Sequence, residues 1–206
     1  MTTRGRPPLL ALVFVMATVA SCYEVDSRGW VFPRGVGVSR IAAANYFPLA
    51  SGWKWTYSVW MNGLKTQEVH AVLERKGDLA VVQDGAERIT YVVTPEGIAE
   101  KNGDRIGDYV IKSPLSTGAE WAVEGGRARI AFAGGKCGSA RVGFYEGCVL
   151  ISVTRTDPAR VTQTIYAPYL GPVSVTIQVA DGKDFLTIAQ AVLVSVTRPS
   201  DAPAVP

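Results

Sequence analysis

The chain's one histidine and its close pairs of carboxylates are the side chains best suited to acid–base chemistry. Glu68 precedes His70 by two residues, so both would share one face of an extended strand. Such a pair acts in catalysis only if the fold adds a nucleophile or a second acid within hydrogen-bonding distance. We interpret His70 and Glu68 as an ordinary pair on the solvated outer face of a strand, and we predict no catalytic residue.

Other acidic pairs indicate no active site or metal site. Glu96/Glu100 and Asp104/Asp108 recur at intervals of four. The segment around Asp104 lacks the ligand order and distal glutamate of a calcium loop. The sequence also contains no GxSxG, no HExxH and no phosphate-binding loop. We therefore predict no metal, no cofactor and no enzyme. A hydrolase whose carboxylates meet only by folding remains an alternative.

The first 21 residues have the pattern of an export signal. Arg4 and Arg6 precede an unbroken apolar or small run, LLALVFVMATVA, at residues 9–20. A helix of this length reaches about 18 Å, too short for a hydrocarbon core of about 30 Å. We predict a cleaved signal peptide at residues 1–21 rather than a membrane span.

Residues 19–22, Val-Ala-Ser-Cys, directly follow the apolar run and resemble the lipobox of bacterial lipoproteins. The resemblance implies that Cys22 receives a diacylglycerol, that cleavage occurs before it, and that its new amine is acylated. Such an anchor hardly leaves a membrane. Tyr23 stands where aspartate signals inner-membrane retention in enteric lipoproteins. The resemblance thus implies the outer membrane, facing the periplasm, in a source with two membranes. An ordinary export signal with a fortuitous cysteine is the alternative.

Cys137 and Cys148 remain once Cys22 is set aside. An even pair in an exported chain favours a disulfide, because the compartment is oxidising. Two unpaired, partly buried cysteines are the alternative. There is no CxxC spacing and no neighbouring histidine in the sequence. Zinc binding and thioredoxin-like chemistry at these cysteines therefore lack support.

The charge gives no indication of a nucleic-acid partner. The net charge of +3 falls to +1 when residues 1–21 are removed with their two arginines. We expect a lipidated N-terminus and tether at 22–45, a single β-domain at 46–198, and a disordered tail at 199–206, which is polar and Pro-rich.

Alternation of apolar and polar residues recurs through the expected domain and predicts β-strands. Clear examples are 53–59, 69–73 and 173–179. Gly-containing turns between these runs favour antiparallel hairpins over βαβ units. We predict an all-β, mainly antiparallel fold with roughly ten to twelve strands. They form a strongly curved meandering sheet, a half-barrel or a barrel, with little helix after the signal peptide.

Aromatic residues dominate the first expected strand. Trp53, Trp55 and Tyr57 alternate, so their rings lie on one face. Core packing is the favoured interpretation, and a ligand platform for a sugar or a lipid is the alternative. Trp60 falls on the opposite face and is the candidate for an exposed or groove-lining ring. These four aromatic residues are the candidate ligand contacts.

Residues 46–57, YFPLASGWKWTY, resemble the opening motif YFPLxxGxxWxY of a group of poorly characterised bacterial lipoproteins. Later stretches fit the same family: GAEW at 118–121, GFYEGC at 143–148 with a shift of one residue, and YAPYLGPV at 166–173. Tyr169 stands where the family usually has glycine. The resemblance implies a curved antiparallel sheet, loosely like periplasmic lipoprotein carriers and receptors, and implies no agreed activity.

Two functional hypotheses follow for a lipid-anchored, non-enzymatic envelope protein. In the first, the sheet binds an apolar ligand, such as a lipid or acyl chain, in a cavity of several hundred Å³. In the second, the core is fully packed, and a sheet edge or loop docks an envelope protein. That arrangement would leave an exposed apolar patch or an unpaired strand. An envelope hydrolase is third, and needs polar residues clustered in a cleft.

Overall fold

The computed structural model describes residues 23–25, 31–33, 37–139, 141–182 and 184–200. The predicted signal peptide, Cys22 and tail residues 201–206 lie outside the described residues, so the lipidation stays a prediction. Within the described ranges the chain is mostly strand, and the predicted all-β fold is confirmed. None of the helix in these ranges is long and apolar enough to cross a membrane.

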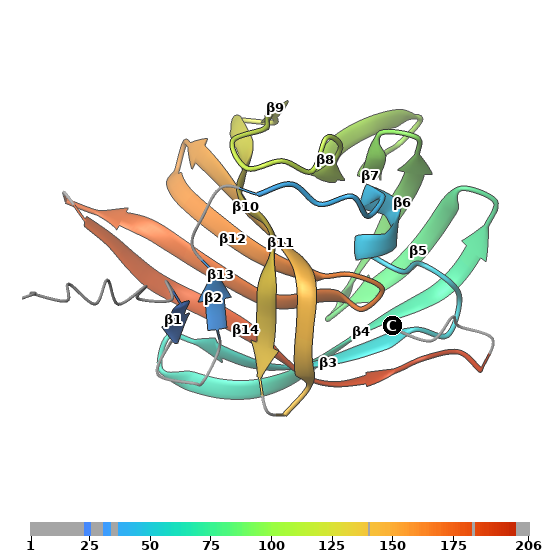
Figure 1. The fold of residues 1–206 in the computed structure, drawn as a ribbon, viewed down its shortest axis with the longest axis horizontal. Coiled ribbons are helices and arrows are strands. Elements are labelled where there is room, and N and C mark those ends of the chain that lie inside the picture. The colour runs from blue at the N-terminus through green and yellow to red at the C-terminus, as the bar shows by residue number, and fades with distance from the viewer. Residues whose placement is uncertain (1–22, 26–30, 34–36, 140, 183, 201–206) are drawn as a thin grey trace, which may run out of the picture.

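Twelve strands of the described chain form one antiparallel sheet, preceded by a two-stranded hairpin and one 3-10 helix (Figure 1). The elements are β1 (Tyr23–Val25), β2 (Val31–Pro33), η1 (Ala43–Tyr46), β3 (Lys54–Met61), β4 (Leu64–Lys76), β5 (Leu79–Asp84), β6 (Glu87–Thr94), β7 (Gly97–Asn102), β8 (Arg105–Lys112), β9 (Glu120–Val123), β10 (Gly126–Ser139), β11 (Gly143–Thr156), β12 (Ala159–Ala167), β13 (Gly171–Asp181) and β14 (Asp184–Thr197). The sheet order runs from β8 back to β3, then from β14 back to β9.

This order is a meander that curls into a nearly closed barrel, with β8 and β9 as its edges (Figure 1). Side chains bridge the seam between the two edges. Trp121 Nε1 donates a 3.0 Å hydrogen bond to the Tyr109 carbonyl. The Asp108 carboxylate accepts from Glu124 N at 2.8 Å and lies 3.3 Å from Arg155 Nη2. These contacts join the edges where the backbone ladder stops.

Residues 37–52, here called the strap, cross the concave side of the sheet (Figure 1). Ser39 N donates to the Leu115 carbonyl at 2.8 Å, and Tyr169 N donates to the Asn45 carbonyl at 2.7 Å. The strap therefore reaches from the β8–β9 connection to the β12–β13 turn. Its contacts extend the packed part of the chain toward the N-terminus, beyond the expected start at residue 46.

The strap fills the interior of the barrel with large side chains. Tyr46 and Leu49 are buried, and the Phe47 ring lies 5.5 Å from Trp55 and 5.2 Å from Tyr91. Apolar side chains from the sheet complete the core, including Trp53, Val72, Val82, Ile98, Ile111, Ile130, Val149, Ile151, Leu170, Val173 and Leu193. A sheet with one dry face must cover that face, and here the chain's own strap contributes to the cover.

Candidate functional site

Three aromatic residues at the start of β3, one of them directly before the strand, lie in the core. Trp53, Trp55 and Tyr57 are at most 2% exposed, and the two tryptophan rings stack at 5.7 Å. Trp55 Nε1 donates to the Leu170 carbonyl at 2.6 Å, and the Tyr57 hydroxyl donates to the Pro172 carbonyl at 2.8 Å. Both polar atoms are thus satisfied by the β12–β13 corner. This placement agrees with the core-packing interpretation of these rings.

Trp60 lies at the other end of the same strand and is 45% exposed. Met61 and Leu64 flank the β3–β4 turn and are also exposed. The β13–β14 hairpin lies beside this turn, because Asn62 N donates to the Ile188 carbonyl at 3.3 Å. That hairpin exposes two more large apolar side chains, so five share this end of the sheet. We call this set the apolar hairpin end: Trp60, Met61, Leu64, Phe185 and Leu186.

The predicted disulfide between Cys137 and Cys148 is confirmed. It joins β10 to β11 beside a shift in their register, and the Cα atoms are 6.0 Å apart. Both cysteines are buried at 1% exposure or less. The bond thus closes a short loop inside the core, near the β10–β11 turn.

Removing this disulfide should destabilise the fold. The closed loop spans 11 residues, and its entropy predicts a loss of about 3 kcal/mol in the free energy of unfolding for Cys137→Ala/Cys148→Ala. Urea denaturation of the variant and the unsubstituted protein measures this loss. Reductant is the control, because it should lower the free energy of unfolding of the unsubstituted protein to that of the variant. Equal midpoints under oxidising conditions would contradict the expectation.

An open pocket of about 600 Å³ lies at the turn end of the barrel, outside the packed interior. We call it the turn pocket, and its lining is Ile41, Phe144, Tyr145, Glu146, Pro168, Tyr169 and Arg198. The Arg198 guanidinium lies 5.7 Å from the Trp53 ring centre, and Glu146 pairs with Lys136 at 2.6 Å. Aromatic walls beside one cation suit an apolar molecule with an anionic group.

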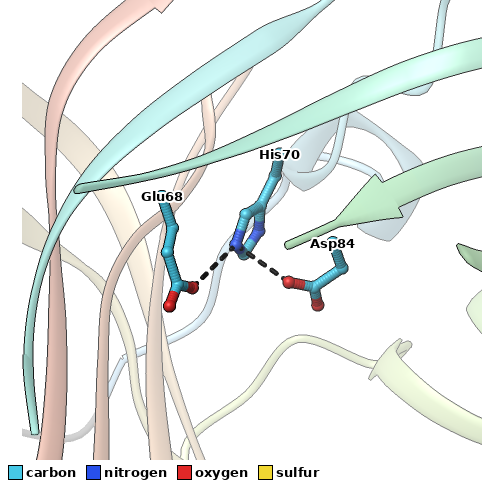
Figure 2. A group of neighbouring side chains, drawn as sticks. All are labelled: Glu68, His70 and Asp84. Atoms are coloured by element: carbon cyan, nitrogen blue, oxygen red, sulfur yellow. Dashed lines mark ion pairs between the residues drawn. The ribbon is translucent and has the colours of Figure 1, made fainter. Parts of the chain in front are cut away.

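His70 lies on the inner face of β4, not on the outer face as expected, and it meets two carboxylates there (Figure 2). The register pairs His70 with Trp55, whose side chain is buried, so both side chains point to the same side. His70 Nε2 lies 2.9 Å from Asp84 Oδ1 and 3.8 Å from Glu68 Oε2. Sequence reasoning missed Asp84, because only the pairing of β4 with β5 brings it opposite His70.

Further carboxylates make the inner face near His70 acidic. Burial raises the pKa of Glu100, and the charges of Asp108 and Asp84 raise it further, while Arg155 lowers it. Burial also raises the pKa of Tyr57 well above its usual range, with Asp84 adding to the effect. Asp84 contributes to both shifts, and its negative charge favours cations on this face.

Glu100→Gln should stabilise the protein more at pH 7 than at pH 4. The folded pKa of Glu100 is raised above its usual 4.5, so the folded state binds the proton more tightly than the unfolded state. Glu100 therefore costs stability as the pH rises from the unfolded pKa through the folded pKa. Urea midpoints at both pH values test this, with the exposed Glu74→Gln as control. An equal gain at both pH values would contradict the assigned cause.

Together these features define an all-β domain with a filled barrel, one disulfide and an apolar end. No family model matches the chain, and no curated protein sequence matches it. Two solved structures resemble the fold. A candidate exported protein with a YmcC-like fold from Bacteroides fragilis is 13% identical with a TM-score of 0.47, covering 75% of this chain and 100% of its own. A candidate lipoprotein from Parabacteroides distasonis is 9% identical with a TM-score of 0.38, covering 75% and 99%. At these TM-scores the likeness carries no functional argument.

Proposed function

We propose that this is a lipid-anchored, non-enzymatic envelope protein that docks a protein partner at the membrane surface through its apolar hairpin end. The observation that carries the proposal is the gathering of five exposed apolar side chains on two adjacent hairpins. Single exposed apolar residues are ordinary, whereas several gathered at one end of a domain are typical of an interaction surface.

The filled interior favours docking over carriage of a ligand inside the barrel. Tyr46, Phe47 and Leu49 of the strap occupy the concave side, and Trp53 and Trp55 pack among them. A carrier would need an apolar cavity of several hundred Å³ in this space. A rigid, packed domain loses little conformational freedom when its surface binds a partner.

The shape of the apolar hairpin end also suits a protein partner. Met61 lies opposite Leu64, so both side chains point to one face, and Trp60 points to the other. In Figure 1 both hairpins extend to the left of the barrel. Trp and Phe are among the residues enriched in the buried centres of interfaces. The apolar hairpin end presents two such residues, Trp60 and Phe185, on its two neighbouring hairpins.

The lipid on Cys22 would keep this surface among other envelope proteins. The lipobox-like residues 19–22 support that anchor. Confinement to a membrane raises the effective concentration of a partner held there, so a modest surface gives stable association. We propose that the protein lies in the outer membrane and faces the periplasm, because Tyr23 stands where aspartate would signal retention in the inner membrane.

Native electrophoresis of solubilised envelopes tests the proposal. The unsubstituted protein should migrate in a complex with another protein, and Leu64→Ser/Leu186→Ser should migrate alone. Leu79→Ser is the matched control, because Leu79 is 37% exposed and lies at the β4–β5 turn, away from the apolar hairpin end. Equal migration of the control and the double variant would overturn the assignment of this surface.

The turn pocket supports a second candidate, the binding of an apolar ligand with an anionic group. Its volume of about 600 Å³ suits a lipid-sized molecule, and Arg198, Phe144 and Tyr145 are among its lining residues. Native mass spectrometry should then show a stoichiometric added mass that disappears on denaturation and in Phe144→Ser/Arg198→Ser. A ligand-free mass in gently purified protein would remove this candidate.

A further inference from the structure

We propose that Glu68, His70 and Asp84 form a binding site for a divalent transition-metal ion, with Zn²⁺ as the ion that best matches the donors. The site is independent of the docking surface. One imidazole nitrogen and two carboxylate oxygens converge from two neighbouring strands, and these three donor atoms lie within 4.8 Å of one another (Figure 2).

Strand geometry explains why the three donors meet. Glu68 and His70 are two residues apart on β4 and therefore share one face. Asp84 is the last residue of β5 and pairs directly with His70 in the ladder. Directly opposed residues of antiparallel strands hold their side chains close together on the same face. All three donors are thus carried by the backbone of the sheet rather than by a mobile loop.

The distances match a metal site that needs only small side-chain adjustments. Tetrahedral donors with metal–ligand distances of about 2.0–2.2 Å lie about 3.3–3.6 Å apart. His70 Nε2 lies 2.9 Å from Asp84 Oδ1 and 3.8 Å from Glu68 Oε2, on either side of that range. The donor atoms all lie within 4.8 Å of one another, and rotation of the two carboxylates would bring their oxygens closer to a common ion. Three protein donors leave the fourth position for water or another ligand.

The imidazole nitrogen that faces the carboxylates is itself unsatisfied. His70 Nε2 is buried and makes no hydrogen bond of normal geometry, despite its closeness to Asp84. Buried polar atoms without a partner are rare in proteins, and an ion is one of the recognised explanations. Tyr57 packs against the His70 ring at 4.8 Å between centroids and limits how far the ring can turn away.

The surroundings favour a cation and let it enter. Asp84 and Glu100 act on the same buried tyrosine, Tyr91, so their negative charge extends along this face. The side chains of Glu68, His70 and Asp84 are 42%, 26% and 39% exposed, so the cluster is open to solvent even though Nε2 itself is covered. The imidazole distinguishes transition metals from Mg²⁺ and Ca²⁺, which prefer shells made of oxygen alone.

The test uses the full mature protein in detergent, made without a histidine tag and treated with chelator. His70 is the chain's one histidine, so its ring gives a single set of imidazole NMR signals. Zn²⁺ should shift those signals and saturate at one ion per chain, and calorimetry should give the same stoichiometry. Ring signals unmoved by saturating Zn²⁺ would overturn the proposal.

Substitutions separate this site from adventitious binding. His70→Gln should weaken Zn²⁺ binding at least about 100-fold, beyond the range seen when only outer-shell partners are changed. Glu68→Gln/Asp84→Asn keeps the ring and should weaken binding comparably, so the site is tested even if His70→Gln folds poorly. Glu74→Gln/Asp78→Asn, on β4 and the turn after it, is the matched control and should bind normally. One-to-one binding of undiminished affinity in the double variant would overturn the site.

Discussion

Replacing Trp55 with alanine should lower the free energy of unfolding by about 3–5 kcal/mol, the usual cost of deleting a large buried aromatic side chain. Trp55 is 1% exposed and packs between Trp53 and Phe47. The substitution also leaves the Leu170 carbonyl without its hydrogen bond from Nε1. Trp55 therefore ties β3 to the β12–β13 corner as well as filling the centre of the core.

Trp60→Ala is the matched control, because it removes the same side chain from the same strand at 45% exposure. Urea denaturation should show a change well below that of Trp55→Ala, since surface substitutions usually have small effects. A loss for Trp60→Ala equal to that for Trp55→Ala would contradict the division of β3 into a buried wall and an exposed tip.

Phe47→Ala should lower the free energy of unfolding by a similar amount, about 3–5 kcal/mol, because it leaves a cavity between the strap and the sheet. The Phe47 ring contacts both Trp55 and Tyr91, whose strands lie on different parts of the barrel. Hydrogen exchange should also become faster at Ser39 and Tyr169, because their amides are among the donors that hold the strap to the rest of the barrel.

Phe185→Ala serves as the control for the strap, because Phe185 is 50% exposed at the apolar hairpin end. It should leave both the urea midpoint and the exchange of the strap unchanged. If Phe47→Ala left strap exchange as slow as in the unsubstituted protein, the strap would not depend on this ring. The packed interior would then not be what holds the strap in place.

The overall fold was predictable because alternation and turn residues act locally. The alternation of Trp53, Trp55 and Tyr57 identified both a strand and its buried face, because three large rings on one face need burial in the core. The confirmed disulfide followed from an even cysteine pair in an exported chain. These inferences needed no knowledge of which strands are neighbours.

The face of β4 was not predictable in this way. Val69 and Leu73 suggested an inward apolar face, but they are 48% and 47% exposed, whereas Val72 is buried. Pairing with β3 sets the face of His70, and an irregularity in the pairing with β5 between Val72 and Glu74 shifts the alternation. Both faces of β4 carry polar side chains, so the sequence of β4 alone does not set which face points to the core. Pairing with β3 and β5 sets it.

The candidate metal site was hidden for the same reason. Glu68 and His70 were visible as a pair in the sequence, but Asp84 lies across a hairpin and joins them only through the β4–β5 register. The apolar hairpin end was likewise hidden, because Leu64 and Leu186 are far apart in the chain. Only Trp60 was indicated beforehand, by its position on the face opposite Trp53.

Photo-crosslinking from the apolar hairpin end shows whether this surface docks a partner protein. A photoreactive phenylalanine at Phe185, in intact envelopes, should yield one discrete adduct with another protein, and Leu186→Ser should abolish it. The same probe at Leu79 is the control and should yield none. An absent adduct at 185, a mass equal to two copies of this chain, or the same adduct from position 79 would contradict docking of a partner by this end.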